Sequence, residues 1–297
     1  MDLHAPLVSI IIPCFNHGKY INEAINSIEQ KNLNYSIEII IVDDGSTDVD
    51  TINKIEELIQ QGFVVIKQKN GGPAKARNTG ISASKGKYIL PIDADNKIKP
   101  DYINKSIPIL EKEDFDIVYA KPIFWNDKKK MNRKFKVRPF DELSFVTGNF
   151  ADACAVYRKS VWEKNNGYDE NIPYHGFEDW EFWINAASNG FKFKFINEYL
   201  FYYRILENSV ISSYKDEDRS IINHRYIAQK HSDLFLEKLV KLNYVREKYE
   251  MDILRFPIVP FIYLFYLLGL VAKPSFKANK RFTLYKPQNT NRLDNDR

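Results

Sequence analysis

Two aspartates separated by one small residue, Asp93 and Asp95, follow a short apolar run from Tyr88 to Ile92. The run has the composition of a buried strand. Because side chains alternate between the two faces of an extended chain, both carboxylates are predicted to point the same way. Two carboxylates on one side suit a hard divalent cation such as Mg²⁺ or Mn²⁺, which takes oxygen ligands from carboxylates and substrate phosphates. The alternative is an acidic turn that caps the next helix.

The elements that must position these acids alternate regularly in the first hundred residues. Short apolar runs predict strands at 7–14, 37–42, 63–66 and 88–92, and amphipathic patterns predict helices at 20–30, 51–61 and 73–84. This order predicts an α/β fold with a mainly parallel sheet and helices on both faces. Ligands of such sheets lie beyond the carboxyl ends of the strands, so the residues that follow the strands are the candidates for a site.

Acidic and basic residues follow the second and third strands. Asp43 and Asp44 could accept hydrogen bonds from a ribose hydroxyl or a base N–H, and the alternative is that such acids only cap the next helix. The glycine pair 71–72 opens the third helix, with Lys75 and Arg77 one turn in, and a helix N-terminus with basic side chains suits a diphosphate. The glycine fingerprints of dinucleotide sites and of P-loops are missing from these positions, which disfavours a dehydrogenase or an NTPase.

Four stretches in this order closely resemble the nucleotide-sugar half of glycosyltransferase family 2, which has the GT-A fold. They are residues 8–16 (VSIIIPCFN), 40–48 (IIVDDGSTD), 70–80 (NGGPAKARNTG) and 93–95 (DAD), and the resemblance covers about residues 7–210. It implies inverting transfer of a sugar from a nucleoside diphosphate, usually UDP, with Mg²⁺ or Mn²⁺. It also implies that Asp95 binds the metal and that the nucleotide sugar is bound by Pro13, Phe15, Asp43, Asp44, Gly71, Lys75, Arg77, Asp93 and Ala94.

A second acidic pair, Glu178 and Asp179, opens an aromatic amphipathic pattern that runs to about Asn189. Inverting transfer is a single displacement, so the attacking hydroxyl must lose its proton to a group away from the metal. The pair resembles the Glu-Asp motif of the family, whose second acid is the base. This resemblance implies that Asp179 is the catalytic base and that Glu178 orients the acceptor or supports the base. The alternative is that both acids stabilise the helix N-terminus.

The sequence does not identify a third protein ligand for the metal. Many members of the family carry a His shortly after a Tyr-Arg pair, but this chain has Leu206 there, after Tyr203 and Arg204. We therefore expect the metal to rest on Asp95, the diphosphate and waters, which suits Mg²⁺. His175 is a possible substitute, although a lone loop His is more often polar surface.

Composition sets outer bounds on function. The 297 residues include 43 basic and 39 acidic side chains, a net charge of +4, which gives no basis for binding nucleic acid. Cys14 and Cys154 stand in apolar runs and are predicted to be buried free thiols in a reducing compartment. Residues 1–6 have neither the basic nor the apolar region of a secretory signal, so we expect a cytoplasmic protein.

The last eighty residues differ in character. Residues 216–250 predict two polar amphipathic helices. Residues 256–272 carry no charge and lie between Arg255 and Lys273, at the lower length limit for a spanning helix, and basic residues follow. We predict peripheral contact with the inner face of the membrane through this segment, while a spanning helix or a buried contact helix stays open.

The predicted organisation divides the chain into a nucleotide-sugar-binding half (1–120), an acceptor-binding half (121–212), a helical extension (213–252), a membrane-association segment (253–287) and a tail (288–297). The predicted function is transfer of a sugar, UDP-linked as the first expectation, to a hydroxyl of a growing glycan, with a lipid-linked acceptor as one option. A non-catalytic nucleotide-sugar-binding subunit of a glycan-synthesis complex is the alternative. Asp95 and Asp179 argue against that alternative, and Leu206 favours it. A nucleotidyltransferase would need a glycine-rich basic first loop that this chain lacks.

Overall fold

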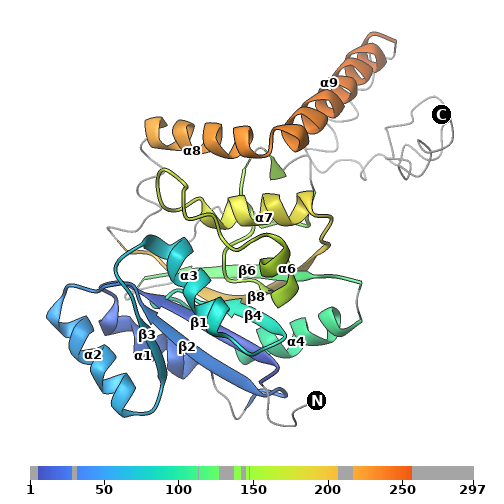
Figure 1. Ribbon diagram of the computed structural model, residues 1–297. Coiled ribbons are helices and arrows are strands. Elements are labelled where there is room, and N and C mark those ends of the chain that lie inside the picture. The colour runs from blue at the N-terminus through green and yellow to red at the C-terminus, as the bar shows by residue number, and fades with distance from the viewer. Residues whose placement is uncertain are drawn as a thin grey trace. The chain divides into compact units, whose positions relative to one another are not determined.

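Within the residues that the computed structural model describes (6–28, 32–112, 114–126, 137–141, 145–146, 148–206 and 217–255), one mixed sheet of eight strands organises the chain. Its order is β3-β2-β1-β4-β7-β6-β8-β5. Figure 1 labels β1 to β4, β6 and β8. The chain forms two compact units, residues 1–232 and 233–297, and the sheet lies in the first.

The first four strands are parallel, as the β-α alternation predicts. They are β1 (Val8–Cys14), β2 (Ile37–Asp43), β3 (Val64–Lys67) and β4 (Tyr88–Pro91), and β1 pairs with both β2 and β4. The helices between them are α1 (Gly18–Ser27), α2 (Val49–Gln60) and α3 (Gly72–Ala83). Each boundary lies within three residues of its predicted position because β-branched runs and turn residues mark the ends locally.

The second half of the sheet is mixed. Strand β7 (Val156–Arg158) is antiparallel to both β4 and β6 (Ile117–Trp125), β6 is parallel to β8 (Phe193–Arg204), and β5 (Lys97–Ile98) is antiparallel to β8. The helices of this half are α4 (Pro100–Glu111), α6 (Lys159–Lys164) and α7 (Glu178–Ser188). Helix α7 begins and ends where the sequence predicts, before Gly190, whose φ of 81° suits the end of a helix.

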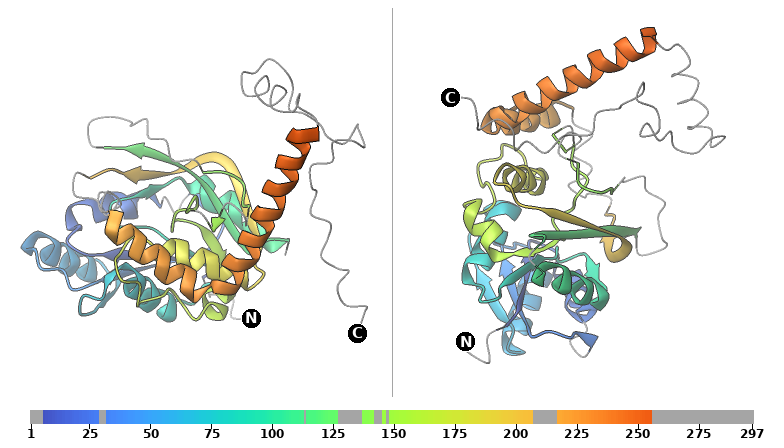
Figure 2. Two further views of the ribbon diagram at one scale, coloured as in Figure 1. Left: turned by 90° about the horizontal axis from the view of Figure 1, so that it is seen from above. Right: turned by 90° about the vertical axis from the view of Figure 1, so that its right-hand side faces the viewer.

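Helices cover both faces of the sheet (Figure 2). On one face, Ile10 and Ile12 of β1 join a buried cluster with side chains of α1, α2 and α4, such as Ile21 and Ile103. On the other face, a Cβ added at Gly80 of α3 would lie 2.5 Å from Ile11, so this glycine allows close packing of α3 on β1. The prediction of an α/β fold with helices on both faces is confirmed.

The two cysteines are free and buried, as predicted. Burial raises the pKa of Cys14 to about 12, because a thiolate is poorly solvated in the apolar core. Burial also raises the pKa of Cys154 well above its usual value.

The chain before β7 is a loop instead of a longer strand. Among residues 148–158 only Val156–Arg158 form a strand, because Asn149 and Asp152 bond to the backbone N–H groups of Ala151 and Cys154. Residues 127–136 and 142–144, which follow β6, lie outside the described residues.

The region after residue 216 forms two helices, as the sequence predicts. They are α8 (Glu217–Lys230) and α9 (Ser232–Arg255), and α8 belongs to the first compact unit. Among the described residues, no helix is long and apolar enough to cross a membrane. The apolar segment 256–272, on which the membrane prediction depends, lies outside them, and so does the tail 288–297.

Candidate active site

The loops after β1 and β2 are joined by one asparagine. Asn16 has a φ of 55°, and its Oδ1 accepts from the backbone N–H groups of Thr47 (2.8 Å) and Asp48 (3.1 Å). Since Asn tolerates the left-handed region, it can turn the chain here and still reach the next loop. The β1 loop also presents Phe15, which is 43% exposed, beside the half-buried Pro13. Both predicted nucleotide-binding residues therefore lie at the carboxyl edge of the sheet.

Asp44 organises the glycine loop that opens α3. Its side chain is buried, Oδ1 accepts from Gln68 (2.7 Å) and from the N–H of Gly71 (2.9 Å), and Oδ2 accepts from the N–H of Gly72 (2.8 Å). A carboxylate offers about four acceptor positions, so three bonds leave Oδ2 one position for a ligand. Asp43 is also buried and accepts from the N–H of Ser46 at 3.0 Å. Contact of either acid with a base or ribose stays a prediction.

Lys75 and His175 flank the same glycine loop. Lys75 is exposed and its aliphatic stem lies against Gly71, while the His175 ring lies so close to Gly72 that a Cβ there would be 2.3 Å from Cε1. Gly72 has a φ of 85°, so glycine is required by both conformation and space. His175 thus joins the loop before α7 to the start of α3.

The acids after β4 lie in a turn instead of an extended strand. Strand β4 ends at Pro91, and the N–H of Asn96 donates to the carbonyl of Asp93 at 2.9 Å. The alternation that predicted two carboxylates on one side therefore does not apply, although the two acids remain close. Burial raises the pKa of Asp95 to about 7, and the negative charge of Asp93 adds to that rise. Ala94 between them is buried and belongs to the hydrophobic core.

Arg204 supports this turn from β8. Its backbone N–H donates to the Oδ1 of Asn96 (2.9 Å) and its Nε donates to the carbonyl of Asp95 (3.0 Å). The guanidinium lies 3.9 Å from the ring centroid of Trp125 and 4.3 Å from that of Tyr20. Such stacking holds a planar cation firmly, so Arg204 fixes the backbone that carries Asp95.

Arg77 joins the two acidic pairs. Its Nη2 donates to Asp93 Oδ1 and its Nη1 to Glu178 Oε1, both at 2.8 Å, and its side chain is 4% exposed. Glu178 also accepts from the N–H of Gly176 at 2.7 Å. Burial alone would raise the pKa of Glu178, but the charge of Arg77 and its hydrogen bond hold it below the usual value. The predicted contact of Arg77 with the diphosphate stays a prediction.

Asp179 follows Glu178 on α7 and lies in an acidic environment. Burial raises its pKa well above the usual value, and the negative charges of Glu178 and Asp152 add to the rise. A carboxyl with a raised pKa is a better proton acceptor than an ordinary one once it is ionised. The structure therefore brings together both predicted acidic pairs through Arg77.

Sequence reasoning assigned no role to Asn149, Asp152 or Tyr203. Asn149 donates from Nδ2 to Asp179 Oδ2 at 2.9 Å. Burial, with the charge of Asp93, raises the pKa of Asp152 to about 7, and burial together with these acids raises the pKa of Tyr203 well above its usual value. The signal that could have found Asp152 is an acid within an otherwise apolar run, 151–157. Leu206 is partly buried and offers no metal ligand.

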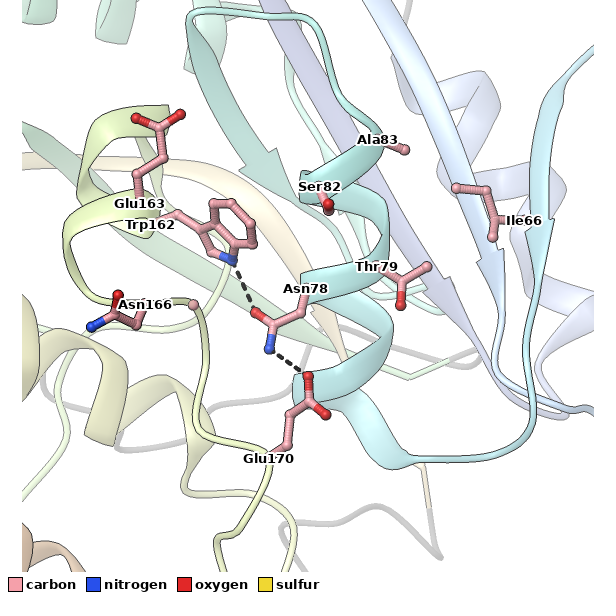
Figure 3. A pocket seen from close by; sticks show the side chains of 10 residues that line it. Ile66, Asn78, Thr79, Ser82, Ala83, Trp162, Glu163, Asn166 and Glu170 are labelled. Carbon is pink, nitrogen blue, oxygen red and sulfur yellow. Dashed lines mark hydrogen bonds between the residues drawn. The ribbon is translucent and has the colours of Figure 1, made fainter.

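A separate pocket of about 890 Å³ lies beside α3 and is lined by none of the predicted site residues. Asn78 fixes its wall, because its Oδ1 accepts from Trp162 Nε1 (2.9 Å) and its Nδ2 donates to Glu170 (2.8 Å) (Figure 3). The Oδ1 of Asn78 also accepts from the backbone N–H of Tyr168 at 2.7 Å, and its Nδ2 donates to the carbonyl of Tyr168 at 2.8 Å. All four hydrogen-bonding positions of this amide are used to hold the turn before α7 against α3.

The fold is similar to that of solved structures of S. aureus TarS. The form of residues 1–349 in complex with UDP-GlcNAc matches with a TM-score of 0.57 and 22% identity, over 70% of this chain and 61% of that one. The complex with UDP matches with a TM-score of 0.55 and 21% identity, over 67% of this chain and 60% of that one. This chain therefore spans about three fifths of those structures, and it has the GT-A fold.

The sequence relatives are glycosyltransferases. An uncharacterized glycosyltransferase of Methanocaldococcus jannaschii is 28% identical over 69% of this chain and 72% of its own length. The putative teichuronic acid biosynthesis glycosyltransferase TuaG of Bacillus subtilis is 26% identical over 70% of this chain and 82% of its own length. The model of "Glycosyl transferase family 2" matches residues 9–165, and the chain belongs to that family.

Proposed function

We propose that this glycosyltransferase catalyses inverting transfer of a sugar from a UDP-sugar to a hydroxyl of a growing glycan in polysaccharide or lipopolysaccharide assembly, with Mn²⁺ or Mg²⁺. The observation that carries the proposal is the convergence of two acidic pairs, Asp93 with Asp95 and Glu178 with Asp179, on one buried guanidinium. A chain that only bound a nucleotide sugar would not need the second pair.

The acids after β4 fit a divalent cation. Asp95 lies beside Asp93 in a partly buried turn, and its pKa is raised to about 7 first by burial and then by the negative charge of Asp93. A hard cation would compensate that charge and is suited to carboxylate oxygens. In the part of the chain that the structure describes, no group of three or more His, Cys, Asp or Glu side chains is arranged to hold a metal. Asp95 would therefore share the cation with the diphosphate and water, and Leu206 agrees with that small ligand set.

The remaining steps belong to side chains of this chain. A cation at Asp95 would stabilise the charge that develops on the departing diphosphate. Asp179 accepts the proton of the acceptor hydroxyl as that oxygen attacks the anomeric carbon from the opposite side. Arg77 holds Glu178 and Asp93 in register, so that the donor and acceptor groups keep a fixed separation. Asp44 keeps the glycine loop in place at the start of α3, where helix N–H groups suit a phosphate.

The relatives support the choice of donor and pathway. TarS has been solved with UDP and with UDP-GlcNAc, TuaG is named for teichuronic acid biosynthesis, and a chondroitin synthase of Pasteurella multocida is 28% identical over 74% of this chain and 22% of its own length. These names favour UDP-linked donors and polymeric glycan acceptors. A lipid-linked acceptor and peripheral contact at the inner face of the cytoplasmic membrane complete the proposal, on the basis of the apolar and basic sequence after residue 255.

Thermal-shift measurements with UDP, GDP, dTDP and CMP, each with and without Mn²⁺, test the donor site. We expect UDP with Mn²⁺ to raise the melting temperature of the wild type, and Asp95→Ala to abolish the Mn²⁺-dependent part. Asp101→Ala, which removes an exposed acid from the first turn of α4, is the matched control and should keep the shift. A folded wild type that no nucleotide stabilises would contradict the proposal.

The base assignment has its own test. Release of UDP from UDP-glucose, UDP-galactose, UDP-GlcNAc and UDP-GalNAc is measured with Mn²⁺ and with water or a simple sugar as the acceptor. We expect Asp179→Asn to lower the rate at least a hundredfold without loss of the UDP-dependent thermal shift. Wild-type turnover in Asp179→Asn would show that another group accepts the proton.

A further inference from the structure

Asn149 makes two hydrogen bonds that fix the orientation of its amide. Its Oδ1 accepts from the N–H of Ala151 at 3.0 Å, and its Nδ2 donates to Asp179 Oδ2 at 2.9 Å. A backbone N–H can only donate, so the oxygen must face Ala151 and the NH₂ group must face Asp179. The chemistry of the partners thus determines which way the amide points.

The loop that carries Asn149 is held against α7 and the core. The hydroxyl of Tyr102 donates to the carbonyl of Cys154 at 2.7 Å, and the N–H of Cys154 donates to Asp152 at 2.9 Å. On the α7 side, Trp180 Nε1 donates to the carbonyl of Phe145 at 2.8 Å, and the Phe145 ring packs against that of Phe150 at 4.7 Å. Both ends of the loop are therefore anchored, and Asn149 keeps a fixed position relative to Asp179.

Both oxygens of Asp179 receive an N–H donor. Oδ1 accepts from the N–H of Trp180 at 2.7 Å, and Oδ2 accepts from Asn149. Each bond favours the ionised carboxylate, because a protonated oxygen accepts more weakly. Each oxygen keeps one further acceptor position, which a substrate hydroxyl can use.

The negative charges near Asp179 oppose these two donors, and the positive charge nearby acts with them. Glu178 on α7 and Asp152 on the loop raise the pKa of Asp179, whereas Arg77 on α3 lowers it. Tyr168, before α7, and Tyr203, on β8, also lie within its electrostatic reach, and both hydroxyls stay neutral because their pKa values are raised. Burial and two like charges therefore favour the protonated acid, and Asn149 is a neutral donor that acts in the other direction.

We propose that Asn149 is a positioning residue for the catalytic base, because its amide aims the Asp179 carboxylate and favours its ionised form. The inference rests on the proposed function, in which Asp179 accepts the proton of the acceptor. Asn149 contacts no reacting atom and acts only through Asp179.

The test is the pH profile of kcat/KM for UDP release in the presence of Mn²⁺, using the same four UDP-hexoses. In Asn149→Ala, the acid limb should move to higher pH by about one unit, the size of one lost hydrogen bond to a charged group. KM for the UDP-hexose should stay within about twofold, because Asn149 lies on the acceptor side. Asn149→Asp keeps an oxygen that can accept from the N–H of Ala151, but it puts a second carboxylate next to that of Asp179. The acid limb of its pH profile should therefore move to higher pH by at least as much as in Asn149→Ala.

Asn165→Ala is the matched control. Asn165 is also a buried amide against α7, but it donates to the carbonyl of Phe182 at 3.0 Å and touches no acid. It should lower the melting temperature and leave the acid limb in place. A limb that stays at the wild-type pH in both Asn149 variants, with the rate lowered equally at every pH, would reduce Asn149 to a structural role and overturn the inference.

A double-mutant cycle on stability gives a readout that needs no turnover. Asn149→Ala and Asp179→Ala should show a coupling energy that is larger at pH 9 than at pH 5, because the hydrogen bond weakens as the falling pH protonates Asp179. No coupling at either pH would refute the contact. If Asp179→Asn turns over at the wild-type rate, Asp179 is not the base and the proposed function fails. If Asp179→Asn is inactive but the acid limb of the Asn149 variants stays at the wild-type pH, only the inference about Asn149 is refuted.

Discussion

Removal of the guanidinium of Arg77 should destabilise the protein more than the loss of any surface ion pair. Both of its hydrogen bonds are 2.8 Å long, and the side chains of Arg77 and Glu178 are 4% and 9% exposed. In Arg77→Met, Glu178 stays buried without its charge partner. Breaking a buried pair in this way costs about 3–5 kcal/mol of unfolding free energy. Asp93 is 35% exposed, so its loss adds little to that figure.

The expected loss has a defined pH dependence. In the wild type, the pKa of Glu178 is lowered, so its contribution to stability is present above the unfolded pKa of about 4.3 and is lost as the pH falls through the folded value. In Arg77→Met, burial is opposed only by backbone N–H bonds such as that of Gly176. We expect burial to dominate, which raises the pKa of Glu178 and makes the variant less stable as the pH rises above about 4.3. The difference in unfolding free energy between wild type and Arg77→Met should therefore be small near pH 4 and should reach its whole value near pH 8.

Urea titrations at pH 4, 6 and 8 measure this difference. Near pH 8 the melting temperature of Arg77→Met should lie about 10 °C below that of the wild type, for a compact unit of the size of residues 1–232. Lys67→Met, which breaks an exposed pair with Glu56, is the control and should cost less than about 1 kcal/mol. Arg77→Met with Glu178→Gln should recover more than half of the loss. A loss below about 1 kcal/mol at pH 8, or one that does not change with pH, would refute the reasoning.

Three further outcomes are expected. Gly72→Ala should cost at least about 1–2 kcal/mol, because its φ is 85° and its Cβ would press on the His175 ring, and it should also weaken the UDP-dependent thermal shift. Gly62→Ala, with a φ of 88° and no atom within 4 Å of its Cβ, should cost about 1–2 kcal/mol from the backbone conformation alone and keep the shift. Arg204→Lys should raise about tenfold the Mn²⁺ concentration that gives half of the UDP-dependent thermal shift. The reason is that Lys cannot both stack on Trp125 and reach the carbonyl of Asp95. An unchanged Mn²⁺ requirement would contradict the role of Arg204 in holding the turn that carries Asp95. Lys230→Met, which leaves the fully buried Glu181 with one cationic partner fewer, should speed hydrogen exchange in α8 about tenfold, whereas exchange at the wild-type rate would show that His231 suffices.

The parts of the site that follow parallel strands were predictable. The carboxyl ends of β1, β2 and β4 meet at one edge, so the placement of Asp43, Asp44, Asp93 and Asp95 follows from strand order alone. Local patterns also marked the start of α7 at Glu178. In these cases the information lies within about ten residues of sequence.

The partners of these residues were not predictable, because they depend on contacts between distant segments. Arg77 reaches Glu178 across 101 positions, and Arg204 reaches the carbonyl of Asp95 across 109. Asn149 has no periodic signal, since its loop bonds to itself instead of joining the sheet. The sequence left a turn at Asp93–Asn96 open as the alternative to an extended strand, because an apolar run predicts a strand but does not fix its last residue.

The pairing of β4 with β7 limits how this chain can be divided. Tyr88 pairs with Arg158 and Ile89 with Tyr157, so one sheet runs through both the predicted nucleotide-sugar-binding half and the predicted acceptor-binding half. A fragment that ended at residue 120 would carry a bare strand edge with the apolar side chains of β4 beside it, and it should aggregate when expressed alone. By the same geometry, a movement of residues 1–120 relative to the strands β6 and β7 would have to break the backbone hydrogen bonds that join β4 to β7.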